Sequence, residues 1–264
     1  MEKCDSCHKR KSNQSFGKVF IVGTGPGSID HITSAAIKAI DGADVIVGYK
    51  TYLDLIPELL VGKEILSSAM MQEVERCKKT LEIAEKGQKV AIISGGDPGI
   101  YAMAGLIFEL AAESNSPTEI EVIPGIAAIN GCAARLGAPL MHDFAAISLS
   151  DLLTPWSIIE KRLSAAAEAD FVIALYNPKS KKRTEHIIKA RERIMEHRSG
   201  KTPVGVVTAC NRDNEKVTIT TLDNLLDADI NMQSTVIIGN STTFQWKECM
   251  ITPRGYADKY RFRG

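Results

Sequence analysis

Glycine- and proline-rich segments follow three apolar runs of this 264-residue chain, and their composition suits a small-ligand site. They are Gly23-Thr-Gly-Pro-Gly27, Ser94-Gly-Gly-Asp-Pro-Gly-Ile-Tyr101 and Pro124-Gly-Ile-Ala-Ala128. Glycine lets a ligand approach the backbone closely, and open α/β sheets bind ligands beyond the carboxyl ends of their strands. Three such loops at corresponding strand ends therefore predict one ligand site at a sheet edge.

The motifs that these loops lack exclude several classes of ligand. A dinucleotide fingerprint needs glycine at its first, third and sixth positions, whereas Ser28 stands sixth here and Pro26 stiffens the turn. The GxxxxGK[ST] pattern of nucleoside triphosphate sites is absent, as are the G-x-S-x-G and H-E-x-x-H motifs of hydrolases. Asp97 has an alternative interpretation, because an aspartate before proline can cap the next helix.

The elements that position these loops follow from alternating strand-like and helical patterns. Strands are predicted at Val19–Val22, Val45–Val47, Val90–Ile93, Ile120–Ile123, Ala145–Ser148, Phe171–Leu175, Val204–Thr208 and Thr235–Ile238. Such alternation predicts an α/β fold with a largely parallel sheet in its first half. The β-branched stretch Lys216–Thr221 favours a mixed sheet in the second half.

Helices between the strands are expected to pack on the sheets through one apolar face each. One lies around Thr33–Asp41, and another carries Val74, Cys77, Leu81 and Ala84 on one side. A third begins with Thr154 as N-cap and Pro155 as first helical residue and presents Ile158, Ile159, Leu163 and Ala166; a fourth presents Ile187, Ile188, Ile194 and Met195.

Three divisions of the chain are expected: a flexible polar tail (1–16), an N-terminal α/β domain (17–140) and a C-terminal α/β domain (141–264). Residues 136–143, punctuated by glycine and proline, form the predicted junction. Within the tail, Cys4-Asp-Ser-Cys7-His8 matches a c-type haem attachment motif formally, but a complete metal site would need a further ligand. The tail is therefore expected to bind neither metal nor haem, and no metal site is predicted elsewhere.

Composition excludes several classes of function. Lysine plus arginine equal aspartate plus glutamate at 32 each, so no overall field attracts nucleic acid or an anionic membrane. No apolar run approaches the roughly 20 residues that span a bilayer, and the polar start lacks a signal-peptide apolar region. A cytoplasmic location is expected, with Cys77, Cys132, Cys210 and Cys249 reduced.

In order and spacing, the three loops resemble the cofactor motifs of the tetrapyrrole (corrin/porphyrin) methylases. The resemblance extends from Gly17 to Tyr256. Further segments resemble the branch that methylates carbon 17 of precorrin-3B or its cobalt-containing counterpart: Gly48–Tyr52, His142–Phe144, Ser148–Trp156, Tyr176–Arg183 and Thr252–Tyr256. The match at Ser148–Trp156 is the most specific.

The resemblance implies a homodimer of two α/β domains that bind S-adenosylmethionine in the cleft between them and release S-adenosylhomocysteine. The implied cofactor residues are Pro26, Gly95, Gly96, Asp97, Ile100, Ala127 and Ala128, with Asn177 and Gly205 from the second domain. The family's first loop often ends in aspartate, where this chain has Ser28 with Asp30 two residues on.

The implied reaction methylates carbon 17 and contracts the macrocycle, extruding carbon 20, in cobalamin biosynthesis. S-adenosylmethionine is already electrophilic, so alignment and water exclusion are the main requirements. Contraction also moves protons, and His142, Asp143 and Asp151 are the predicted acid or base residues, each with a purely structural alternative. Whether the ring already carries cobalt stays open; the cobalt-containing form is favoured.

The substrate's peripheral carboxylates call for cationic contacts. Arg183 and Arg254 are preferred because arginine binds carboxylates bidentately, and Tyr49 and Lys50 are placed to face the cleft. The lysines beside Arg183 could contact substrate carboxylates or simply lie at a solvent-exposed helix start; they are Lys179, Lys181 and Lys182. Another corrin-pathway methylase and a nucleotide-binding module without catalysis are the alternative functions.

Overall fold

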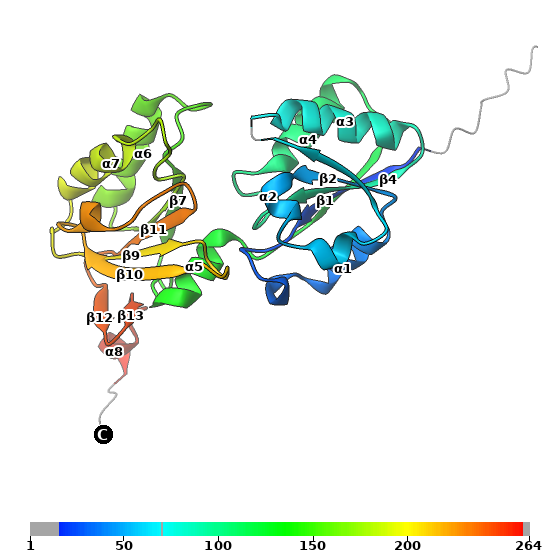
Figure 1. The fold of residues 1–264 in the computed structure, drawn as a ribbon. Coiled ribbons are helices and arrows are strands. Elements are labelled where there is room, and N and C mark those ends of the chain that lie inside the picture. The colour runs from blue at the N-terminus through cyan, green and yellow to red at the C-terminus, as the bar shows by residue number, and fades with distance from the viewer. Residues whose placement is uncertain (1–15, 70, 261–264) are drawn as a thin grey trace, which may run out of the picture.

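Two α/β lobes make up the computed structural model, which describes residues 16–69 and 71–260 (Figure 1). The first lobe contains a parallel sheet of order β3-β2-β4-β1-β5. Its strands are β1 (Lys18–Gly23), β2 (Val45–Tyr49), β3 (Glu64–Ser68), β4 (Lys89–Ser94) and β5 (Glu119–Ile123). The expected parallel first half is confirmed.

Helices cover both faces of this sheet, as its apolar strands require. Helix α1 (Ser34–Asp41) and the short α2 (Lys50–Leu53) and η2 (Pro57–Leu60) pack on one face, and α3 (Glu73–Glu85) and α4 (Met103–Glu113) on the other. Thr33 caps α1 by accepting a hydrogen bond from the N–H of Ala36 at 3.1 Å. The single turn η1 (Ile29–His31) follows the first glycine-rich loop.

The second lobe holds a mixed sheet of order β10-β9-β11-β8-β7, as expected. Its strands are β7 (Phe144–Ser148), β8 (Val172–Tyr176), β9 (Pro203–Thr208), β10 (Lys216–Thr221) and β11 (Ser234–Ile238). Only β7 and β8 pair in parallel; β8, β11, β9 and β10 pair antiparallel in that order.

Three helices cover this sheet. Helices α6 (Trp156–Glu168) and α7 (His186–Met195) pack on one face, and α5 (Ala128–Leu136) packs on the other; η3 (Leu225–Asp227) joins the α6/α7 side. The predicted start of α6 is wrong by one residue, because Pro155 is the N-cap and Trp156 the first helical residue. The residues predicted to form the apolar faces of the helices are buried or partly buried, except Val74 and Ile158, which are exposed.

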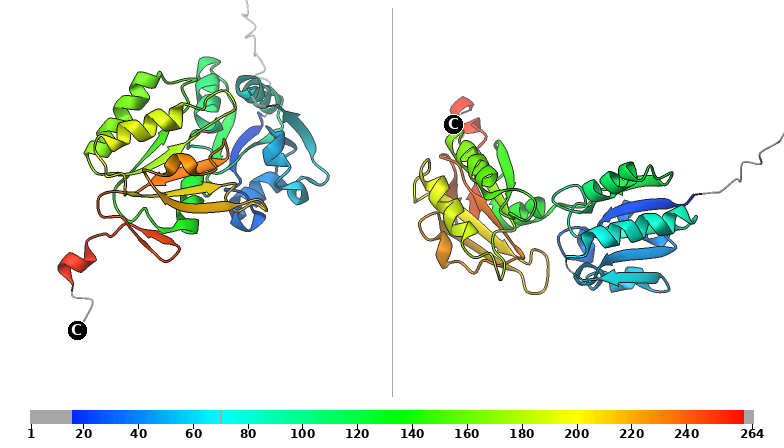
Figure 2. Two further views of the ribbon diagram at one scale, coloured as in Figure 1. Left: turned by 60° about the vertical axis from the view of Figure 1, so that its left-hand side comes forward. Right: turned by 90° about the horizontal axis from the view of Figure 1, so that it is seen from above.

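Helix α5 connects the lobes. It begins directly after the loop that follows β5, yet its buried side chains, including Ile129, Cys132 and Leu136, pack against strands of the second sheet. The junction expected at residues 136–143 therefore follows a helix that already belongs, by packing, to the second lobe. Figures 1 and 2 show this green segment joining the two lobes.

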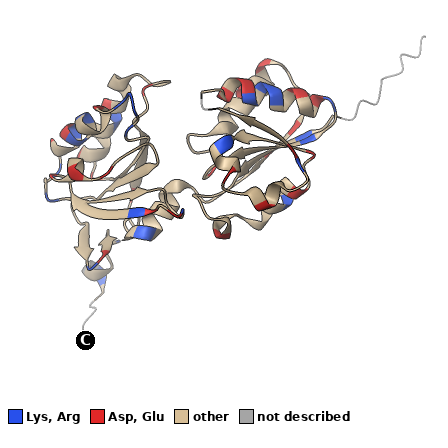
Figure 3. Cartoon of the chain, viewed as in Figure 1, with Lys and Arg blue, Asp and Glu red and all other residues tan. Residues whose placement is uncertain are grey.

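A small third sheet lies at the end of the chain. It joins β6 (Gly137–Ala138), β12 (Phe244–Trp246) and β13 (Cys249–Ile251), and α8 (Tyr256–Lys259) follows. None of these short strands, nor β3, was predicted. Charged residues of both signs intermingle on the helices, most visibly on α3 (Figure 3).

The expected flexible tail lies, apart from Phe16, outside the described residues, and so do Cys4, Cys7 and His8. Among the helices that the structure describes, none combines the length and hydrophobicity needed to cross a membrane.

Candidate functional site

The three glycine-rich loops meet at the carboxyl edge of the first sheet. Gly25 and Gly96 exchange two backbone hydrogen bonds, of 3.1 and 2.7 Å, across the first two loops. A Cβ atom built on Gly23 would lie 2.7 Å from the nitrogen of Gly125, the oxygen of Gly96 and Cδ of Pro98. The three backbones are thus in direct contact, and the absence of a side chain at Gly23 permits this.

Asp97 holds the second loop against the third. Its Oδ1 accepts a hydrogen bond from the N–H of Gly99 at 2.8 Å, and its Oδ2 accepts one from the N–H of Gly125 at 3.2 Å. The alternative that Asp97 caps the following helix is wrong, because α4 begins only at Met103 and its N-cap is Ala102. Its carboxylate instead positions the two loops that are predicted to hold the cofactor.

Tyrosines tie the loops to the second lobe. The hydroxyl of Tyr176, at the end of β8, accepts a hydrogen bond of 3.0 Å from the N–H of Ile129 in the first turn of α5. The hydroxyl of Tyr101 donates to the carbonyl of Ala146 in β7 at 2.8 Å, and the two rings lie 5.2 Å apart. Burial raises the pKa of Tyr176 to about 12, so its hydroxyl stays neutral at physiological pH.

The predicted cofactor residues of these loops differ in exposure. Ala127 is the N-cap of α5 and is buried, Ala128 is its first residue, and Ile100 is 39% exposed. Tyr101, which follows Ile100, has a φ of 52°, a left-handed conformation that is uncommon for a bulky side chain and marks a constrained site.

Glycines also permit close packing of the loops and α5. The ring of Tyr52 covers Gly95, where a Cβ atom would lie 2.6 Å from Cε1 of the tyrosine. Pro26 is buried against Gly131 of α5. Gly205, in β9, faces the side chain of Leu136, so this side of the glycine serves the packing of α5 on the second sheet.

Asn177 and Arg183 belong to one hydrogen-bonded network at the carboxyl ends of β7 and β8. The side-chain amide of Asn177 donates to Oγ of Ser148 at 3.0 Å, and the backbone carbonyl of Asn177 accepts from Nη2 of Arg183 at 3.0 Å. Nη1 of Arg183 donates to Oγ of Ser150 at 3.2 Å. Much of the donor capacity of Arg183 therefore fastens the segment after β8 to the segment after β7.

Asp151 pairs with a histidine that the sequence did not single out. Oδ2 of Asp151 lies 3.0 Å from Nε2 of His186, the first residue of α7, and the imidazole meets the ring of Trp156 edge-on at 4.6 Å. The close approach of the His186 imidazole lowers the pKa of Asp151 below its usual range. The carboxylate is half-exposed, so it remains accessible beside the Arg183 network.

The family described as tetrapyrrole (corrin/porphyrin) methylases matches residues 18–226, most of the chain. The chain belongs to this family. A cobalt-factor III methyltransferase of Priestia megaterium is 52% identical over 248 residues, which cover 92% of this chain and 46% of that protein, so the chain spans about half of its length.

Two further comparisons cover nearly complete proteins. A probable cobalt-factor III C(17)-methyltransferase of Salmonella typhimurium (strain LT2) is 48% identical over 89% of this chain and 98% of its own. The crystal structure of the methyltransferase CobJ superposes with a TM-score of 0.85 at 35% identity and covers 90% of this chain and 100% of that one. The predicted family and fold class are therefore confirmed.

In this tetrapyrrole methylase, the three predicted proton-transfer residues do not lie together. His142 and Asp143 precede β7 and line a cavity of about 370 Å³ at the amino ends of β7 and β8, whereas Asp151 follows β7. A strand of five residues separates the two positions by roughly 16 Å. Nδ1 of His142 accepts a hydrogen bond from the N–H of Asp143 at 2.9 Å.

The predicted substrate residues of the methylase are divided in the same way. Arg254 lines the cavity of His142 and is therefore remote from Arg183. Tyr49, at the end of β2, packs edge-on against Tyr52 with ring centres 5.5 Å apart. Lys50 is exposed and forms an ion pair with Asp54 at 2.8 Å.

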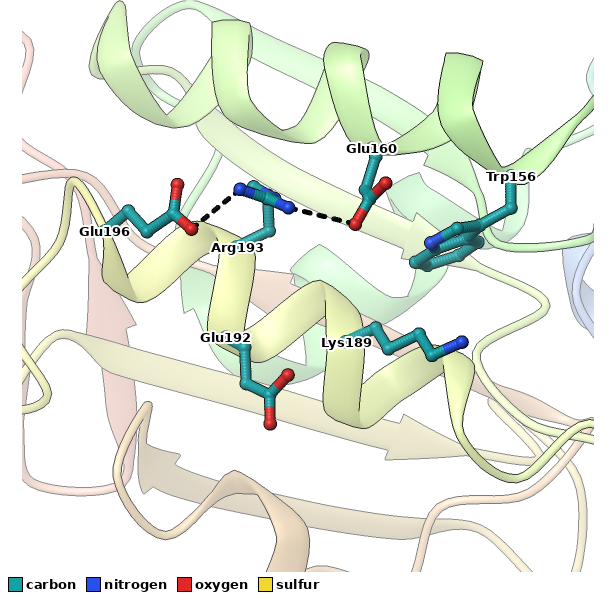
Figure 4. Close-up of a pocket in the computed structure, with 6 residues that line it drawn as sticks. All are labelled: Trp156, Glu160, Lys189, Glu192, Arg193 and Glu196. Carbon is teal, nitrogen blue, oxygen red and sulfur yellow. Dashed lines mark hydrogen bonds and ion pairs between the residues drawn. The ribbon is translucent and has the colours of Figure 1, made fainter.

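A second cavity of the methylase, of about 340 Å³, lies between α6 and α7 (Figure 4). It is lined by Trp156, Glu160, Lys189, Glu192, Arg193 and Glu196. Arg193 pairs with Glu160 at 3.1 Å and Glu196 at 2.7 Å, so its positive charge is already matched by carboxylates of the chain. This groove is on the face of the second sheet opposite α5, away from the loops.

Three residues near the site of the methylase were not predicted as site residues: Tyr176, Tyr52 and His186. Each occupies the carboxyl end of a strand or the segment after it, a position that already suggests proximity to the ligand edge. Among residues 16–69 and 71–260, no group of His, Cys, Asp and Glu has the arrangement of a metal site.

Proposed function

We propose that this chain transfers the methyl group of S-adenosylmethionine to carbon 17 of a precorrin-3B-type tetrapyrrole, with contraction of the macrocycle, in cobalamin biosynthesis. The family and its named relatives supply the class of reaction and substrate. The single structural observation that supports the proposal is the contact of three bare backbone loops at the carboxyl edge of one sheet.

The residues present fit S-adenosylmethionine. Backbone groups of the loops are the contacts that a nucleoside and an amino-acid moiety require, and a glycine places no side chain of its own between its backbone and a ligand. None of the loops has the lysine of a phosphate site, which agrees with a cofactor that carries no phosphate. The cofactor supplies a methyl group on a positively charged sulfur.

The chain's own residues would act by orientation and exclusion of water. Asp97 keeps the second and third loops in register, and Tyr101 and Tyr176 fix the second lobe relative to them. Such fixed geometry lowers the entropic cost of aligning the nucleophilic carbon with the methyl group. Asp151, with His186 behind it, is the proposed site of proton transfer that this geometry favours.

The direct test is a transfer assay with methyl-labelled S-adenosylmethionine and purified cobalt-factor III. We expect label in the macrocycle, located at carbon 17 by NMR, and inhibition by S-adenosylhomocysteine. The Gly105→Ala variant should transfer label as the wild type does, because a Cβ atom at this position meets no atom within 4 Å. Binding of the cofactor without label transfer to either substrate form would refute the enzymatic proposal.

The metal state of the substrate and the assembly of the protein are finer proposals. The names of the relatives favour the cobalt-containing ring, and parallel assays with cobalt-loaded and metal-free precursors would test this. A homodimer is proposed from the family resemblance alone. Light scattering coupled to size exclusion would give its mass, and a monomer at assay concentration would contradict it.

A further inference from the structure

Arg212 lies where the turn between β9 and β10 meets the first glycine-rich loop. A Cβ atom built on Gly27 would lie 2.7 Å from Cγ of Arg212 and 2.6 Å from the carbonyl oxygen of Cys210. The aliphatic part of the arginine therefore packs directly on the backbone of the loop. No sequence motif drew attention to this residue.

The turn that carries Arg212 is firmly held. The N–H of Arg212 donates to the carbonyl of Ala209 at 3.0 Å, and its own carbonyl accepts from the N–H of Glu215 at 2.9 Å. Oε2 of Glu215 accepts from the N–H of Asn211 at 2.6 Å. The position of the arginine is thus set by the backbone of its own segment.

Among residues 16–69 and 71–260, the guanidinium of Arg212 makes no hydrogen bond or ion pair. Its Nε is buried without a partner, as are the Nε atoms of Arg183 and Arg198, but those two arginines donate through their Nη atoms. The nearby carboxylate of Glu215 is occupied by Arg135, whose Nε lies 2.7 Å away. Arg183, the arginine predicted to bind substrate, already donates to Ser150 and Asn177.

The charge of Arg212 acts on the tyrosine that packs on the second loop. Burial raises the pKa of Tyr52, and the positive charge of Arg212 opposes that rise. Tyr52 covers Gly95 of the second loop and packs against Tyr49, a predicted substrate contact. The stem of Arg212 thus packs on the first loop, and its charge is felt by a side chain beside the segment expected to face the ring.

We propose that Arg212 binds a peripheral carboxylate of the tetrapyrrole. An unpaired buried donor is costly, and a carboxylate would satisfy it with charge-assisted, bidentate hydrogen bonds. The inference rests on the proposed function for the identity of the substrate. The carboxylate of the cofactor's amino-acid moiety is the other source of the same chemistry, and the experiment separates the two.

The test is equilibrium binding of cobalt-factor III, followed by absorbance, to the wild type and to Arg212→Gln, Arg212→Lys and Arg193→Gln. We expect Arg212→Gln to weaken tetrapyrrole binding at least about tenfold. Arg212→Lys should lose less affinity, because lysine keeps the positive charge but cannot form the bidentate hydrogen bonds of a guanidinium. Arg193→Gln removes a positive charge in the groove between α6 and α7, away from the loops, and should bind as the wild type does.

Parallel titration with S-adenosylhomocysteine shows whether each variant keeps its fold and its cofactor site. Unchanged tetrapyrrole affinity in Arg212→Gln would overturn the inference, and so would a loss confined to S-adenosylhomocysteine. Because binding is measured without turnover, a wild type that binds the ring but transfers no methyl group refutes the proposed reaction and leaves this comparison valid. A wild type that binds no tetrapyrrole refutes both.

Discussion

Gly23→Ala is expected to abolish tight cofactor binding by separating the three loops. The added methyl group would lie 2.7 Å from atoms of Gly96, Gly125 and Pro98, which belong to the other two loops. Ordinary contact needs about 3.4 Å, so the loops must move apart by about 0.7 Å. Misplacement by about 1 Å can cost a factor of about 100 in rate, so we expect at least a tenfold increase in the Kd of S-adenosylhomocysteine.

Isothermal titration calorimetry with S-adenosylhomocysteine measures this effect, and thermal unfolding measures stability in parallel. Overpacking of this kind costs about 1–3 kcal/mol, which corresponds to a decrease of several degrees in Tm. Gly105→Ala, in the first turn of α4, adds the same methyl group in open space and should bind normally with equal or higher Tm. Wild-type affinity in Gly23→Ala would refute the argument that contact of the backbones forms the site.

Three other substitutions test separate contacts. Asp97→Ala removes acceptors from both loops and should raise the Kd of S-adenosylhomocysteine at least tenfold by calorimetry; an unchanged Kd would show that the loops hold their register without it. Tyr176→Phe leaves the N–H of Ile129 without its acceptor and should lower Tm by a few degrees, and no change in Tm would count against this contact. In His186→Gln the pKa of Asp151 should return toward 3.8, because the imidazole that lowers it is gone. The lowered pKa stabilises the wild-type fold above pH 3.8, and this stabilisation disappears as pH falls through the folded pKa. The difference in Tm between wild type and His186→Gln should therefore shrink as the pH is lowered below 3.8, and a constant difference would contradict this.

The fold was predictable where apolar runs are long and buried. Strands β1, β4 and β11 are such runs, and β1 and β4 adjoin helices that bury one apolar face. Strand β3 was missed because its sequence, Glu-Ile-Leu-Ser-Ser, belongs to a half-exposed edge strand with little apolar signal. All residues of β12 are exposed, so its pairing depends on β13 rather than on burial.

The loops of the site were predictable from glycine spacing, but the long-range roles of side chains were not. Asp97 has the sequence context of a helix cap, and only the folded chain brings Gly125 within its reach. The separation of His142 from Asp151, in contrast, was already implied by the strand predicted between them. Arg212 has no local signature, since its significance arises from the loop it contacts 185 residues earlier.

The path of the chain through residues 124–128 couples ligand occupancy to the cohesion of the whole molecule. This third loop both contacts the other two and continues into α5, which packs on the second sheet. A ligand that contacts this loop would bind to the segment that links the two lobes. Its binding free energy would therefore stabilise both lobes. Two lobes that melt separately when free should therefore unfold as one cooperative unit when the ligand is present.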